Sequence, residues 1–115
     1  MDIRESTGYK NSLKKIKRNS NLQQELNKIL SHIESVESFE ELKDSCISTL
    51  YDFEVLRGDL SDYYKFSLNG NKTKYRLLFS YSNLEIVFEY ISDEHYMDFK
   101  RYLRNFDSVK SFMEN

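Results

Sequence analysis

The densest group of side chains suited to phosphate binding lies near the N-terminus. Five cations fall within nine residues, with no acidic residue between them: Lys10, Lys14, Lys15, Lys17 and Arg18. Such a patch is typical of an RNA-binding surface, because neutralising phosphates releases counterions and supplies much of the affinity. The same residues also fit the solvated face of a helix. The whole chain has 17 basic and 19 acidic residues, a net charge of −2, so any RNA-binding surface is local.

Most familiar catalytic motifs are missing from the sequence. It has no Gly-rich phosphate loop, no Cys or His pair at metal-ligand spacing and no serine in a nucleophile elbow. With His32 and His95 as its two histidines, it offers too few ligands for a zinc site, and we predict no cofactor. We interpret His32, beside Ile33, as a surface or half-buried structural residue. Cys46, among apolar neighbours, is predicted to be a small buried thiol.

The elements that must position any site begin with helices. A helix is predicted over residues 9–18, after a short segment that could add an edge strand. A second helix starts at Ser20, and its apolar residues recur at helical spacing: Leu22, Leu26, Ile29, Leu30 and Ile33. Ser38 and Glu41 have the spacing of a capping box. They predict a short third helix that reaches Thr49.

From Tyr51 onward, alternation of apolar and polar residues predicts strands. The expected strands cover residues 52–56, 62–68, 74–81 and 84–91, with turns at 57–58, 69–71 and 82–83. In the last strand, Leu84, Ile86, Phe88 and Tyr90 are expected on one face, opposite Val87 and Ile91. Helical spacing returns after Ser92 or Asp93, and the last ten or so residues look frayed.

Helices followed by a meander predict an α+β fold over a single domain, residues 1–115. We expect the N-terminal helices on one face of an antiparallel β-meander of three to four strands, with a C-terminal helix. A composition of 39% hydrophobic residues suits one core. No apolar run matches the roughly 20 residues of a membrane helix. With one cysteine and no signal-peptide pattern at the N-terminus, we expect a soluble cytoplasmic protein.

Ten residues in the second half occur in a recognisable order: Glu54, Leu56, Leu60, Ser61, Tyr63, Tyr75, Arg76, Leu77, His95 and Tyr96. This ordered set resembles the RelE/ParE toxin superfamily, and within it the YoeB and RelE mRNA interferases. The resemblance covers roughly residues 50–97, and the N-terminal helices in outline. It implies a helix pair on an antiparallel sheet. It also implies the toxin of a bacterial type II toxin–antitoxin system, a ribosome-dependent mRNA endonuclease.

The resemblance further implies a catalytic role for each matching residue. Glu54 would take the proton from a ribose 2′-OH, Arg76 would stabilise the charge on phosphorus, and His95 would protonate the leaving 5′-oxygen. Tyr96 and Lys65 would hold phosphate or base. A carboxylate, an imidazole and a guanidinium suit these roles near neutral pH, and the reaction needs no metal. The implied partners are a cognate antitoxin, the ribosome and mRNA.

Strand alternation predicts which of these side chains share a face. If Tyr64, Phe66, Tyr75, Leu77 and Phe79 face the core, Lys65 and Arg76 share the outer face of the sheet. Glu54 shares a face with Leu56, which would turn its carboxylate inward unless a bulge or the turn at Gly58 redirects it.

Two departures from the family leave other functions open. RelE toxins are usually strongly basic, and the YoeB pattern has arginines where this chain has Phe66 and Ser67. The chain also continues beyond the His-Tyr pair, where the family commonly ends. A ParE-like toxin that poisons gyrase without catalysis is one alternative, and a phage or mobile-element inhibitor that binds a basic protein is another. Codon preference, oligomeric state and antitoxin identity stay open.

Overall fold

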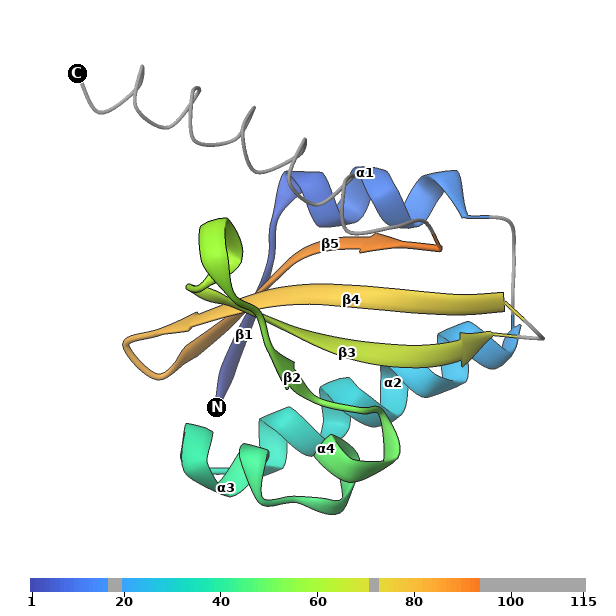
Figure 1. Cartoon of the computed structure of the whole chain (residues 1–115). Helices are drawn as coiled ribbons and strands as arrows, with labels where there is room; N and C mark the ends of the chain where they lie inside the picture. The colour runs from blue at the N-terminus through green and yellow to red at the C-terminus, as the bar shows by residue number, and fades with distance from the viewer. Residues whose placement is uncertain (17–19, 71–72, 94–115) are drawn as a thin grey trace.

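The computed structural model describes residues 1–16, 20–70 and 73–93. In chain order the elements are β1 (Asp2–Glu5), α1 (Thr7–Lys15), α2 (Ser20–Ser35), α3 (Phe39–Lys43), α4 (Cys46–Leu50), β2 (Glu54–Val55), the 3₁₀ helix η1 (Gly58–Leu60), β3 (Tyr63–Gly70), β4 (Thr73–Ser82) and β5 (Glu85–Ser92). Figure 1 shows one twisted sheet, with α2, α3 and α4 below it and α1 alongside β5. The α+β class is therefore confirmed.

The sheet has five strands in the order β1-β5-β4-β3-β2. The strands from β2 to β5 form an antiparallel meander, as the sequence predicts. The N-terminal segment does add an edge strand, but β1 pairs with β5 in parallel. The sheet is therefore five-stranded and mixed, whereas the sequence predicts an antiparallel meander of three to four strands. The helices between β1 and β2 carry the chain from one edge of the sheet to the opposite edge. This long connection allows β1 to run parallel to β5.

The main core lies between the helices and the inner face of the sheet. The α2 helix buries Leu22, Leu26, Ile29 and Ile33, the stripe that its helical spacing predicts. The strands contribute Phe66, Leu68, Tyr75, Leu77, Phe79, Ile86, Phe88 and Ile91 to the same cluster. Tyr9 of α1 packs on Phe88, with ring centroids 5.3 Å apart. The alternating apolar residues of β3 and β4 thus face the helices, as expected.

The predicted third helix is two helices. Ser38 caps α3 by accepting a hydrogen bond from the Glu41 N–H, as the capping pattern predicts. The helix then stops, because Ser45 starts a second one and accepts from the Ser48 N–H at 3.4 Å. This restart turns the following residues, so Cys46 is exposed rather than buried. The prediction of a buried thiol was therefore wrong.

The last hairpin also departs from simple alternation. Its turn is Asn83 and Leu84, both with positive φ, and β5 starts one residue later than predicted. Leu78 pairs with Tyr90 but Phe79 pairs with Phe88, which leaves Glu89 as the extra residue of a β-bulge. The bulge reverses the alternation beyond it. Ile91 therefore joins the main core and Tyr90 packs on the outer face, opposite to the prediction.

Several predicted features lie outside the described residues. They are the C-terminal helix, the frayed last residues, and Asn71 of the β3–β4 turn. Within the described part of the chain, no helix has both the length and the apolar character needed to cross a membrane.

Candidate active site

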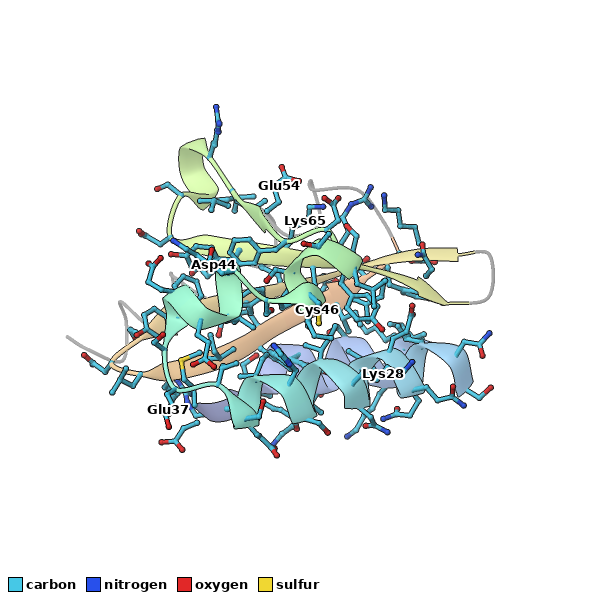
Figure 2. The ribbon with its side chains drawn as sticks, turned by 90° about the horizontal axis from the view of Figure 1, so that it is seen from below. Lys28, Glu37, Asp44, Cys46, Glu54 and Lys65 are labelled. Carbon is cyan, nitrogen blue, oxygen red and sulfur yellow. The ribbon has the colours of Figure 1, made fainter. Side chains whose placement is uncertain are left out.

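Three of the predicted site residues lie on the outer face of the sheet, which points away from the main core. Glu54 of β2 pairs directly with Lys65 of β3, and directly paired residues have their side chains on the same face. In the β3–β4 ladder, Lys65 is opposite Leu78 and Ser67 is opposite Arg76. Arg76 is therefore the diagonal neighbour of Lys65 on that face. Figure 2 shows Glu54 beside Lys65 near the β2 edge of the sheet.

Glu54 faces outward because a second apolar cluster exists on that side. Leu56 and Leu60 are buried against Leu78, with Tyr63 and Tyr90 packed around them. Glu54 and Leu56 do share a face, as the sequence predicts, but it is the outer one. The expectation that Glu54 turns inward was wrong, because it assumed a single core. The carboxylate side chain is 52% exposed, so solvent and a substrate can reach it.

The ammonium group of Lys65 is buried among oxygen atoms. Its side chain is 4% exposed, and Nζ lies 2.7 Å from Ser67 Oγ. Two carboxylates flank it, with Asp52 Oδ2 at 3.3 Å and Glu54 Oε2 at 3.2 Å. The resemblance implies that Lys65 holds phosphate or base. In the structure its charge is already paired with Asp52 and Glu54.

Arg76 lies near the start of β4, the central strand of the sheet, between Ser67 of β3 and Ser92 of β5. Its side chain is partly exposed. From the usual spacing of strands and residues, its Cα is about 12 Å from that of Glu54. A carboxylate that can accept a proton and a guanidinium that can bind an anion thus share one surface. Their side chains can approach opposite sides of a single phosphodiester.

Two cations of the predicted basic patch lie on α1, which packs on the main core through Tyr9, Leu13 and Ile16. Lys14 and Lys15 are exposed in the last turn of α1. The Ser12 hydroxyl, just before them, accepts a hydrogen bond from the Ile91 N–H at 3.0 Å. Ile91 is next to Ser92, the residue opposite Arg76. In Figure 1, α1 and β5 both end where β4 begins, so these lysines and Arg76 lie at the same end of the molecule.

The other predicted site residues are not among those described. They are His95, Tyr96, Lys17 and Arg18. Ser92 precedes His95 by three positions in the sequence, and Ser92 is paired with Arg76.

Sequence reasoning missed Asp52 and Ser67 as members of the site. Ser67 could have been found, because residues two apart on a strand share a face and Lys65 was already a candidate. Asp52 had no such signal. Its backbone has a φ of 50° at the end of α4, where the Phe53 N–H donates to the Ser48 carbonyl at 2.8 Å. This helix-terminating turn directs the Asp52 carboxylate to Lys65.

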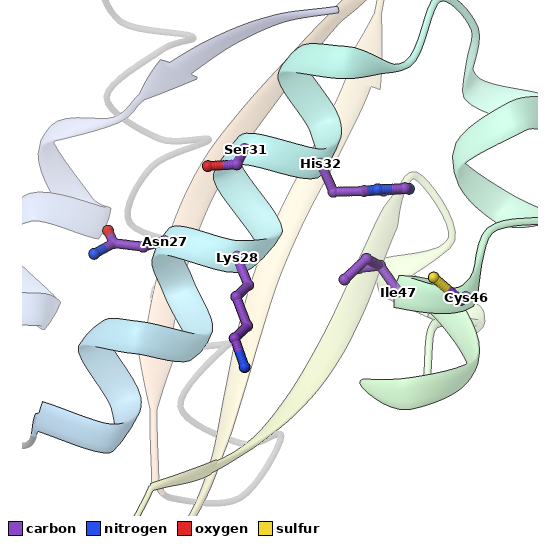
Figure 3. A pocket seen from close by; sticks show the side chains of 6 residues that line it. All are labelled: Asn27, Lys28, Ser31, His32, Cys46 and Ile47. Atoms are coloured by element: carbon purple, nitrogen blue, oxygen red, sulfur yellow. The ribbon is translucent and has the colours of Figure 1, made fainter.

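A groove lies between α2 and α4, away from the outer face of the sheet. Figure 3 shows this shallow groove, which is lined by Asn27, Lys28, Ser31, His32, Cys46 and Ile47. His32 is half-buried, as predicted, and its ring points toward α4. Among the described residues no hydrogen-bond partner reaches its Nε2 atom. No group of three or more potential metal ligands gathers in this groove or elsewhere in the described chain.

Comparison with known proteins adds no identification. No protein-family model matches the chain, and neither the curated proteins nor the solved structures include a significant match.

Proposed function

We propose that the protein is the toxin of a type II toxin–antitoxin system and cuts mRNA on the ribosome. The observation that supports this function is the placement of Glu54 and Arg76 on one open face of the sheet. An exposed carboxylate and a partly exposed guanidinium on a shared surface suit the cleavage of a phosphodiester by its own 2′-OH. The resemblance in the ordered residues from Glu54 to Tyr96 supports the same function.

In the proposed reaction, Glu54 removes the proton of the ribose 2′-OH. The 2′-oxygen forms a bond to phosphorus, and the bond from phosphorus to the 5′-oxygen breaks. Arg76 stabilises the additional negative charge on the phosphoryl oxygens, and His95 gives a proton to the 5′-oxygen. The products are a 2′,3′-cyclic phosphate and a free 5′-hydroxyl. DNA has no 2′-OH and would not be cut.

Substrate binding in this proposal uses the predicted basic patch. Lys14 and Lys15 of α1, together with Lys17 and Arg18, would contact the phosphates of mRNA or ribosomal RNA. Tyr96 would hold phosphate or base. The antitoxin would act by covering the same sheet face.

The experiment that tests the function is induction of the wild type and of Arg76→Ala in a bacterial host. Growth is followed together with primer extension on a translated reporter mRNA. Arg4→Ala is a matched control, because Arg4 is also a strand arginine but lies on β1 at the other edge of the sheet, paired with Glu85 at 3.1 Å. We expect growth arrest and cuts within translated codons for the wild type and Arg4→Ala, and neither for Arg76→Ala.

Other outcomes would reject the catalytic function. Arrest with a DNA-damage response and intact mRNA would instead favour gyrase poisoning. Absence of arrest would favour the inhibitor that binds a basic protein. Cuts that persist in Arg76→Ala would remove Arg76 from the mechanism.

A further inference from the structure

The ammonium group of Lys65 has its donors directed at oxygens of the protein itself. An ammonium has three N–H groups, and three oxygens surround this one: Ser67 Oγ, Asp52 Oδ2 and Glu54 Oε2. The side chain is 4% exposed, so a phosphate has little access to Nζ. Direct binding of substrate by Lys65 would require at least one of these contacts to break.

Lys65 and Glu54 differ in how firmly the backbone holds them. Lys65 belongs to β3, an eight-residue strand with β4 on one side and β2 on the other. The bond to Ser67, two residues along the same strand, holds the ammonium against that strand. Glu54 belongs to β2, a two-residue strand at the edge of the sheet. Few backbone contacts fix β2, so the ion pair with Lys65 contributes much of the order of the Glu54 side chain.

We propose that Lys65 is a positioning residue for Glu54, an inference that rests on the proposed function. Its ammonium engages Oε2 of Glu54 and directs Oε1 toward the outer face, where the ribose 2′-OH would be bound. Asp52 shares the same ammonium from the other side and holds the end of α4 against the strand. Lys65 thus acts on the reaction through Glu54 and makes no contact with the substrate.

The test is a steady-state assay of mRNA cleavage on purified translating ribosomes, in a Cys46→Ser background. Lys65→Met removes the charge and keeps the length of the side chain. In Lys65→Cys, alkylation of the unfolded chain with 2-bromoethylamine followed by refolding restores an ammonium at nearly the same length. Lys43→Met is the matched control, because Lys43 also forms an ion pair, with Glu40 at 3.3 Å, on α3.

We expect Lys65→Met to lower kcat by at least about tenfold with KM within about twofold, because a misplaced catalytic base slows chemistry without weakening substrate binding. Aminoethylation of Lys65→Cys should restore most of kcat, and Lys43→Met should match the wild type. A far-UV circular dichroism spectrum and a KM of Lys65→Met that both match the wild type show that loss of folding does not explain the defect.

Three results would overturn this inference. An unchanged kcat in Lys65→Met would show that Glu54 needs no positioning. A raised KM with unchanged kcat would show that Lys65 binds substrate directly. If the aminoethylated protein is as slow as Lys65→Met, loss of the positive charge does not cause the low kcat. The wild type and Glu54→Ala are assayed first: if the wild type does not cut, or Glu54→Ala cuts equally well, the proposed function itself fails and this inference fails with it.

Discussion

At the scale of single residues, the charge of Lys65 is buried, whereas its two counter-charges lie at the surface. Lys65 is 4% exposed, whereas the side chains of Asp52 and Glu54 are 68% and 52% exposed. A buried charge is costly without a partner, while a surface carboxylate that loses its partner is simply hydrated. Removing the two kinds of charge should therefore have unequal effects on stability.

We predict that Lys65→Met changes the free energy of unfolding by less than about 1 kcal/mol, since Met preserves the apolar stem and removes the buried charge. Asp52→Asn combined with Glu54→Gln should lower it by about 2 kcal/mol, because the ammonium stays buried without a counter-charge. Urea denaturation at neutral pH measures both changes in the free energy of unfolding. Lys43→Met is the control, and its change should be near zero. The prediction fails if Lys65→Met is the less stable of the two.

At the scale of elements, two features of the sheet carry an energetic cost: a leucine with positive φ in the β4–β5 turn and a partly desolvated carboxyl at the edge of β3. The β4–β5 turn places Leu84 at a φ of 62°. Its side chain is 60% exposed, so packing offsets little of this backbone strain. The unpaired edge of β3 is covered in part by Glu25 of α2, whose Oε1 accepts a hydrogen bond from the Asn69 N–H at 3.3 Å. Each feature should respond to one substitution.

Leu84→Gly should raise the free energy of unfolding by about 1 kcal/mol. A two-residue hairpin with positive φ at both positions strongly favours glycine, and a leucine there is strained by its Cβ. Leu50→Gly is the control, because Leu50 is equally exposed, at 65%, but ends α4, where glycine should destabilise. Thermal unfolding of both variants measures this, and equal signs for the two changes would contradict it.

Burial raises the pKa of the Glu25 carboxyl above its usual value of 4.5, although the Asn69 N–H and the charge of Lys28 act in the opposite direction. A raised folded-state pKa means that the stability contributed by this group is present below 4.5 and is lost as pH rises through the folded value. We therefore expect Glu25→Gln to be more stable than the wild type at neutral pH, with the difference vanishing in acid. The amide oxygen can still accept from Asn69.

Urea denaturation across this pH range measures the difference between Glu25→Gln and the wild type. Glu34→Gln, on the same helix but exposed, should show no such trend. A Glu25→Gln protein that is less stable than the wild type at neutral pH would show that the ionised carboxylate is the favoured form.

At the scale of the whole molecule, the two faces of the sheet differ in composition. The inner face carries the main core, and the outer face carries a small apolar cluster beside the charged residues. The net charge of −2 is spread over a chain whose α1 helix still presents Lys10, Lys14 and Lys15 to solvent. An acidic total is therefore compatible with a local basic surface on α1.

If this surface binds RNA, Lys14→Glu with Lys15→Glu should weaken ribosome binding and reduce its salt dependence. The slope of log affinity against log salt should fall by about two, since each lysine lost releases about one counterion fewer. Lys28→Glu with Lys43→Glu makes the same charge change on α2 and α3 and should have a much smaller effect. Sedimentation with ribosomes at several salt concentrations measures both pairs, and equal losses would show that only total charge matters.

Much of the fold was predictable because local chemistry decides it. The alternation in β3 and β4, the α2 stripe and the Ser38 cap follow from the geometry of strands and helices. The shared face of Lys65 and Arg76 follows from that same alternation. These features depend on neighbours along the chain or on a periodicity of a few residues.

The remaining features were decided by contacts between distant segments. The parallel pairing of β1 with β5, the bulge at Glu89 and the outward direction of Glu54 all depend on which strands meet and on a second apolar cluster. The burial of Lys65 depends on Asp52, thirteen residues away, and on the turn that ends α4. The sequence by itself determined the alternation in β3 and β4, the apolar stripe of α2 and the cap at Ser38. Only the tertiary structure decided which charges meet, because a register of pairing is set by packing over the whole sheet.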